Sequence, residues 1–332
     1  LRGIVPQTEV YSIDEAFMDL GGLPTDQLEE LGRNIHSTVK RNTGIPVSIG
    51  IAPTKTLAKV ASKLCKQYPK LHGSCFMHRQ EDIEKVLHKF PLEDVWGIGY
   101  RYAKKLKGQG VKTAWDFTQL SQEWVRARMG IHGLRTWKEL RGEPCVGFEE
   151  APQPKKQICI SRSFAKEVSD YSRLRELVSN FASTCTEKLR LQESCAGEVM
   201  VFVVTNRHRS DQPQQYRNHI TMLPVATDST IEITKAAGDA LAAAYEDGYG
   251  YKRAGVILGG IVSRNAVQAD LFDHTDRSRH TRLMDTMDKL NYRYGKRKVV
   301  VASQGTNPVY WNREHVSPRR TSQWDEIMEI KI

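Results

Sequence analysis

Two adjacent carboxylates, Asp14 and Glu15, are the residues of this chain best suited to metal-dependent chemistry. Successive side chains of a strand point to opposite faces, so both carboxylates can reach one ion only where the backbone turns sharply. Mg²⁺ takes oxygen ligands, and two such ions can activate an attacking oxygen and stabilise a leaving one. A solvated turn is the alternative, but the neighbouring side chains favour a metal site because several are apolar: Ile13, Phe17 and Leu20.

A predicted helix beginning near Pro53 carries four lysines on one side. At 100° per residue they fall within an arc of about 80°, opposite the apolar residues, and we expect them to point outward. Like charges at this spacing repel by a few tenths of a kcal/mol per pair unless an anion faces them. A triphosphate or a DNA backbone would supply that charge, whereas an ordinary lysine-rich surface helix is the alternative. The lysines are Lys55, Lys59, Lys63 and Lys66.

The segment 95–99, Val-Trp-Gly-Ile-Gly, enters a basic helix and matches a helix-hairpin-helix. Its glycines, Gly97 and Gly99, let the backbone approach a phosphate, and the helix N-terminus presents free N–H groups to the anion. Lys104 and Lys105 follow on that helix. Such a contact would hold the DNA backbone without reading bases, although a Gly-x-Gly turn also occurs without any ligand.

Length and composition limit the class of protein. The chain has 332 residues, too many for one compact domain, and a net charge of +10 that favours a polyanionic partner over a merely solvated basic surface. Its 6 cysteines form no CxxC pair and predict reduced thiols in a cytoplasmic protein. No apolar run is long enough to span a membrane. Leu1 in place of Met indicates that the chain begins partway through a longer protein.

Hydrophobic periodicity predicts an α+β multidomain protein. The first part is mixed α/β, with short strands over 10–13, 16–20 and 47–51, and a helix from Leu28 that Gly44 closes. The second part lacks strand signals and is predicted to be a small helical domain. A connector containing Pro and Lys leads to the third part. The boundaries are 1–78, 79–148, 149–157 for the connector, 158–264 and 265–332.

The third part predicts the order strand, helix, strand, strand, helix, strand, a ferredoxin-like βαββαβ unit. The basic segment that follows has little periodicity, and we expect an extended, mobile C-terminal tail. The predicted strands lie near 158–164, 198–205, 219–223 and 252–262, and the helices near 172–192 and 228–246.

Together these segments resemble the Y-family, lesion-bypass DNA polymerases, and within them the UmuC type. They occur in the family's order and cover nearly the whole chain. On this resemblance the α/β part is a partial palm, the helical part a thumb and the βαββαβ part a little finger. The matching segments are Tyr11–Phe17, Gly50–Lys59, Asp94–Gly99, Glu139–Cys145 and Ser161–Phe164.

The resemblance implies template-directed, two-metal nucleotidyl transfer to a primer 3′-hydroxyl, in translesion synthesis during the SOS response. Asp14 and Glu15 would bind two Mg²⁺ ions, with Asp14 bridging both. Lys66 would contact the incoming triphosphate, with Lys59 and Lys55 near it or near the primer. The thumb glycines and lysines would grip the DNA, and the little finger would hold the template strand through Arg162 and Ser163.

The resemblance also implies partners: primer-template DNA, a dNTP, the sliding clamp, a cleaved UmuD dimer and RecA. Residues 268–272, Gln-Ala-Asp-Leu-Phe, are similar to the clamp-docking peptide of bacterial polymerases, with Gln268 opening it. Leu271 and Phe272 would be the apolar anchors. Ala269 departs from the larger apolar residue usual at that position. A Leu-Phe step that packs back onto the little finger is the alternative.

One departure from the family concerns the first metal-binding Asp, the aromatic gate against ribonucleotides and the fingers, which lie upstream of the carboxylate pair. They do not fit within the 13 residues before Asp14, so we expect an N-terminally truncated polymerase that is inactive alone. The alternative function is a non-catalytic module for DNA binding and clamp docking. A nuclease is a third possibility and would need further acidic or His ligands near Asp14.

Overall fold

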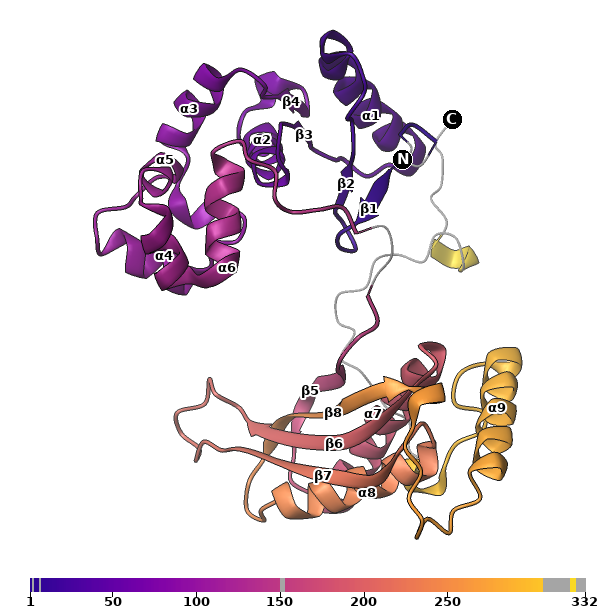
Figure 1. Cartoon of the computed structure of the whole chain (residues 1–332). Helices are drawn as coiled ribbons and strands as arrows, with labels where there is room; N and C mark the ends of the chain where they lie inside the picture. The colour runs from indigo at the N-terminus through magenta and orange to yellow at the C-terminus, as the bar shows by residue number, and fades with distance from the viewer. Residues whose placement is uncertain (2, 6, 150–152, 307–322, 327–332) are drawn as a thin grey trace. The chain divides into compact units, whose positions relative to one another are not determined.

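The computed structural model describes residues 1, 3–5, 7–149, 153–306 and 323–326, which divide into two compact units, 1–152 and 153–332 (Figure 1). Residues 150–152 of the predicted connector and two stretches of the predicted tail, 307–322 and 327–332, lie outside the described residues. Each unit has its own apolar core.

The first unit contains two small two-stranded sheets and a set of helices. Antiparallel β1 pairs with β2, and parallel β3 pairs with β4. The strands are β1 (Thr8–Val10), β2 (Ala16–Met18), β3 (Ile49–Ile51) and β4 (Ser74–Phe76). The helices are α1 (Leu28–Thr43), α2 (Lys55–Gln67), α3 (Gln80–Lys89), α4 (Tyr100–Lys107), α5 (Ala114–Thr118) and α6 (Gln122–Leu140), with short 3₁₀ turns at Thr25–Gln27, Pro69–Leu71 and Leu92–Asp94.

Local signals fix the ends of the first two helices. Gly44 follows α1 with φ of 72°, a left-handed conformation that glycine adopts without strain, as the sequence predicts. At α2 the side chain of Thr54 accepts a hydrogen bond from the Leu57 N–H, so this threonine is the N-cap. The apolar face of α2 then joins the core of the helices over 80–140 through Leu57 and Val60. The lysine helix and the helical part therefore share one core.

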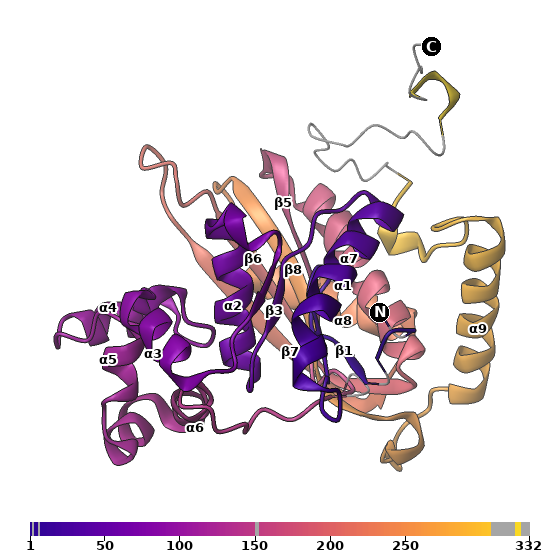
Figure 2. The same cartoon turned by 90° about the horizontal axis from the view of Figure 1, so that it is seen from above.

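The second unit is a four-stranded sheet with two helices packed on one face (Figures 1 and 2). All six predicted elements are present in the predicted order. They are β5 (Ile158–Val168), α7 (Tyr171–Leu191), β6 (Ser194–Thr205), β7 (Tyr216–Thr227), α8 (Thr230–Ala244) and β8 (Tyr251–Ser263).

The strand order, β5-β8-β6-β7, departs from the ferredoxin-like expectation. The first and second strands of the unit, β5 and β6, are separated by another strand, as predicted. The central strands, however, are the second and fourth, β6 and β8, whereas a ferredoxin-like sheet has its first and third strands at the centre. Burial explains this order. Most residues of β6 and of the first part of β8 are buried, whereas β5 and β7 carry many exposed polar residues suited to sheet edges.

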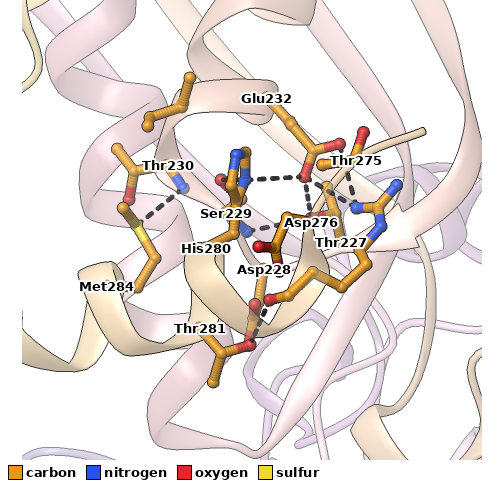
Figure 3. Close-up of polar contacts among 12 residues, drawn as sticks. Thr227, Asp228, Ser229, Thr230, Glu232, Thr275, Asp276, His280, Thr281 and Met284 are labelled. Carbon is orange, nitrogen blue, oxygen red and sulfur yellow. Dashed lines mark hydrogen bonds and ion pairs between the residues drawn. The ribbon is translucent and has the colours of Figure 1, made fainter. Parts of the chain in front are cut away.

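The prediction of an extended tail is wrong for α9 (Arg277–Tyr294), an 18-residue helix that follows a short 3₁₀ turn at Arg264–Ala266. Met284 is the only described α9 side chain that is fully buried, and its sulfur accepts from the Thr230 N–H at 3.2 Å (Figure 3). The other docking contacts are polar: Arg190 binds both oxygens of Asp288 at 2.6 and 2.7 Å. Two more 3₁₀ turns, Ala302–Gln304 and Trp324–Glu326, follow α9.

Asp288→Asn should weaken the docking of α9 by about 1–3 kcal/mol, because the Arg190 side chain, only 8% exposed, loses its charged partner. Hydrogen exchange of the α9 amides measures the change. Asp285→Asn, an exposed neighbour on the same helix, is the control. Equal protection in both variants would contradict the role of this ion pair.

Candidate active site

The carboxylate pair lies in a tight turn between β1 and β2, as predicted. The register runs from Thr8 opposite Met18 to Val10 opposite Ala16, so β1 ends before the pair and β2 begins directly after it. The carbonyl of Glu15 accepts hydrogen bonds from two backbone N–H groups across the turn, each at 3.0 Å. Because the pair lies outside both strands, its side chains need not point to opposite faces, and both carboxylates can turn toward one ion.

Asp14 is exposed and held by its neighbour Ser12, whose hydroxyl donates to the Asp14 carboxylate at 2.5 Å. This hydrogen bond is the main cause that lowers the pKa of Asp14, and the charges of Lys59 and Lys66 lower it further. Of the apolar neighbours, Ile13 gives the pair no shelter, since its side chain is fully exposed, whereas Phe17 and Leu20 are half-buried.

The lysines of α2 divide by environment. Lys59 forms an ion pair with Glu15, and Lys63 pairs with Asp94 at 2.5 Å. Lys66 is exposed, has no ion-pair partner among the described residues, and lies close enough to Asp14 to lower its pKa. Two lysines of one helix, Lys59 and Lys66, therefore lie near the two carboxylates, an arrangement that suits a bound phosphate.

Lys55 departs from the predicted outward stripe. Its side chain is only 7% exposed and pairs at 2.5 Å with the buried carboxylate of Glu9 on β1. Its ammonium also donates to the Gly147 carbonyl at 2.7 Å and lies 5.0 Å from the ring centre of Phe17 and 4.4 Å from that of Phe148. We call this arrangement the Lys55 clasp. It joins the carboxylate hairpin, the start of α2 and the segment before the connector.

The sequence predicted no role for Glu139, which is completely buried on α6. Its carboxylate accepts from the Thr56 N–H at 3.0 Å and from the N–H groups of Cys145 and Val146 at 2.8 and 3.1 Å. Free N–H groups at a helix start and in a turn thus stabilise a charge that has no cationic partner in the described residues. Glu139 ties α6 and the returning chain to α2.

The predicted hairpin packs against the carboxylate turn. Trp96 donates to the Tyr11 hydroxyl at 3.2 Å, and the rings of Trp96, Tyr11 and Phe17 lie 5.5–5.6 Å apart. Gly97 has φ of 95°, and a Cβ there would meet the Thr136 hydroxyl at 2.4 Å, so only glycine fits. Gly99 precedes α4, which has no side-chain cap and keeps free N–H groups.

On the same helix Lys104 and Lys105 are exposed, as a backbone contact requires, whereas Lys107 pairs with Glu93 at 2.7 Å.

The residues predicted in the second unit lie on β5 and in the turn after β8. Arg162 and Ser163 are exposed near the middle of β5, and Arg162 donates to the Ser161 carbonyl at 3.0 Å. Gln268 is exposed, and the side chains of Leu271 and Phe272 are 97% and 83% exposed. The alternative in which Leu271 and Phe272 pack onto this unit is therefore wrong.

The donor set of the turn fits a hard cation with incomplete protein ligation. Among the described residues no group of three or more His, Cys, Asp or Glu side chains is placed to hold a metal. Asp14 and Glu15 would supply two carboxylates, and Mg²⁺ commonly completes such a set with water and substrate phosphates.

Comparison with known proteins gives the family. The model of the impB/mucB/samB family matches residues 1–63, and that of its C-terminal domain matches 155–271. Protein UmuC of Salmonella typhimurium is 36% identical over 335 residues, which span the whole chain and 79% of UmuC. The chain belongs to the UmuC-type, Y-family DNA polymerases.

Other relatives agree with this assignment. Protein MucB of Escherichia coli is 35% identical over 98% of the chain and 78% of MucB, and DNA polymerase IV of Oceanobacillus iheyensis is 24% identical over 100% of the chain and 76% of that protein. A solved Y-family DNA polymerase chimera of Dbh and Dpo4 shares the fold, with a TM-score of 0.59, 17% identity, and coverage of 79% of this chain and 73% of that one.

A domain of unknown function, DUF4113, matches residues 281–330. The predicted resemblance to UmuC-type polymerases is confirmed.

Lys55→Met should lower the free energy of unfolding of the first unit by about 3–5 kcal/mol, because it leaves the Glu9 carboxylate buried and unpaired. Urea unfolding measures the loss, and adding Glu9→Gln should restore most of it. Lys63→Met removes a more exposed pair and should cost less than about 1 kcal/mol. Similar losses from the two lysine variants would contradict a buried clasp.

Ser12→Ala should raise the pKa of Asp14 toward its ordinary value in metal-free protein, because the main hydrogen bond to the carboxylate is lost. The folded-state pKa is lowered, so the ionised group favours folding above its ordinary pKa, and that contribution disappears as pH falls through the folded pKa. NMR titration of the Asp14 carboxyl carbon measures the shift; an unchanged titration would refute the role of Ser12.

Proposed function

We propose that this chain carries out template-directed, error-prone nucleotidyl transfer opposite damaged DNA, in the SOS response. The observation that supports this most directly is the Asp14–Glu15 turn facing Lys59 and Lys66 in a member of the UmuC-type polymerases. Phosphoryl transfer depends mainly on positioning and charge stabilisation, and this turn brings anionic and cationic groups together.

Asp14 and Glu15 would hold two Mg²⁺ ions, which would activate the primer 3′-hydroxyl and stabilise the leaving pyrophosphate. Lys66 would bind the triphosphate because it is exposed and free to reach an anion. Lys59 would exchange its ion pair with Glu15 for a phosphate once a cation neutralises that carboxylate. The resemblance placed Lys55 near the nucleotide. Because Lys55 is buried, it would instead position the β1–β2 turn that carries Asp14 and Glu15.

Residues 1–78, 79–148 and 158–264 would serve as the later palm, thumb and little finger. The free N–H groups at the start of α4, with Lys104 and Lys105, would hold DNA phosphates, and Arg162 and Ser163 would contact the template strand. Such contacts hold DNA of any sequence, as a bypass polymerase requires. No described helix is long and apolar enough to cross a membrane. From family membership we propose a cytoplasmic location.

We further propose that the turn at Gln268–Phe272 docks on the sliding clamp. Phe272 N–H donates to the Asp270 carboxylate at 2.9 Å, and Asp273 pairs at 2.7 Å with Arg277, so the turn is held in shape with both apolar anchors exposed. Preformed shape lowers the ordering cost of binding. The cleaved UmuD dimer and RecA are proposed as further partners from family membership.

The second candidate is a DNA-binding and clamp-docking module without catalysis, because the described residues place only two carboxylates at the turn. Primer extension past an abasic site separates the two functions. It should be measured for the chain alone and for the chain preceded by a palm–fingers segment of a relative.

Asp14→Ala combined with Glu15→Ala should abolish extension in the active form and leave DNA affinity within a few-fold, because the side-chain partners of the two carboxylates are Ser12 and Lys59, not the glycines and lysines of the helix-hairpin-helix. Asp19→Ala is the matched control, since the Asp19 carboxylate accepts from the Gly21 N–H and forms no ion pair with α2 among the described residues. An equal loss of DNA binding would refute the metal-ligand roles. No extension in any form, with DNA bound, would favour the non-catalytic module.

A further inference from the structure

Helix α9 has two opposite faces. Four residues dock it on the second unit: Arg277 contacts Glu232, and Asp288 contacts Arg190. His280 contacts Ser229, and Met284 contacts Thr230 (Figure 3). At 100° per residue these four fall within an arc of about 80°. The helix is therefore fixed in its rotation about its own axis.

The face opposite the docking residues is a basic stripe, defined as Arg279, Arg282, Lys289 and Arg293. On the same helical wheel the stripe also covers about 80°, centred about 180° from the docking face. All four side chains are exposed and have no ion-pair partner among the described residues. They extend over about 21 Å of helix. Two exposed carboxylates, Asp276 and Asp285, lie beside the stripe.

Three more exposed cations, Lys296, Arg297 and Lys298, follow α9 in the next turn. This turn is held on the helix by Asn291, whose side-chain oxygen accepts from the N–H groups of Lys298 and Val299 at 2.8 and 2.9 Å. Asn291 lies on the docking side of the helix, so these cations are held close to α9 but are not counted in the basic stripe.

Aromatic side chains flank the end of the stripe. Tyr292 is 95% exposed and lies three residues from Lys289, hence beside it on the helix surface. Tyr294 is 58% exposed, and the Arg293 guanidinium lies 5.3 Å from its ring centre. Cations that track a backbone, combined with exposed rings on which bases stack, are typical of surfaces that bind single-stranded nucleic acid.

We propose that the outer face of α9 binds single-stranded DNA, through phosphate contacts of the basic stripe and base stacking on Tyr292. The unpaired charges match a polyanion, and four like charges on one helix face are stabilised when phosphates lie against them. This surface shares no residue with the other DNA-contact or clamp-docking residues proposed above. It depends on the proposed function only in taking DNA as the polyanion.

The test is the affinity of the whole chain for a short fluorescent oligodeoxythymidine, measured by anisotropy over a series of salt concentrations. The stripe variant replaces Arg279, Arg282, Lys289 and Arg293 by Gln. The control variant makes the same charge change at exposed cations elsewhere, Lys40, Arg41, Lys188 and Lys235.

The stripe variant should reduce the slope of log K against log salt by about 3, from about 0.7 per phosphate contact, and weaken binding roughly tenfold or more at moderate salt. Tyr292→Ala should weaken binding about five-fold or more without changing the slope. The control variant should change both quantities much less. The melting temperature of each variant should equal that of the unmodified chain, which shows that weaker binding does not come from unfolding.

Equal losses in the stripe and control variants would overturn the proposal and assign the effect to net charge. Loss of duplex binding alone, or no response to Tyr292→Ala, would overturn single-stranded DNA as the occupant. Failure of the proposed polymerase function gives a different result, since primer extension would be absent while single-strand binding still depended on the stripe.

Discussion

The buried ion pair between Glu9 and Lys55 is the contact on which the candidate active site depends. An ion pair at this depth gives little net stability, but an isolated charge left in its place is costly. The two partners therefore must stay together, and each belongs to a different element: Glu9 to β1 and Lys55 to the start of α2. This requirement sets the distance between the hairpin that carries Asp14 and the helix that carries Lys59 and Lys66.

Two further contacts make the arrangement rigid. Glu149 N–H donates to the Glu9 carboxylate at 3.0 Å, and the Phe148 ring covers the Lys55 ammonium, so the chain leaving the first unit is fastened to the site. Glu139 binds the N–H groups of α2 and of the same returning segment. The carboxylate turn, the lysine helix and the start of the connector consequently respond together to any change in the clasp.

Local patterns were sufficient to predict most elements and the chemistry of the turn. Gly44, the proline at 53 and the apolar spacing on either side of Asp14–Glu15 act within a few residues, and they predicted the helix end, the helix start and the turn. The burial of Lys55 could not be predicted in this way, because helical spacing places it among outward lysines while its partner lies 46 residues away in sequence. Glu139 was missed for the same reason.

Helix α9 and the sheet order of the second unit were also missed through long-range effects. The docking of α9 rests on Met284 and on polar pairs with Glu232 and Arg190, so its apolar periodicity is weak. The apolar residues near Met284 and the Asp276 cap were the available signals. The strand order follows from the burial of β6 and β8 on a shared core, which the order of elements along the chain does not specify.

The most direct test of this account is the rate of single-nucleotide incorporation by the Glu9→Gln, Lys55→Met double variant, in protein that carries an upstream palm–fingers segment. Removing both charges should keep the fold and the DNA affinity. The rate should nevertheless fall by about tenfold or more, because a displacement of about 1 Å at reacting groups can cost about 100-fold. An unchanged rate would contradict the clasp as the device that positions Asp14 and Glu15.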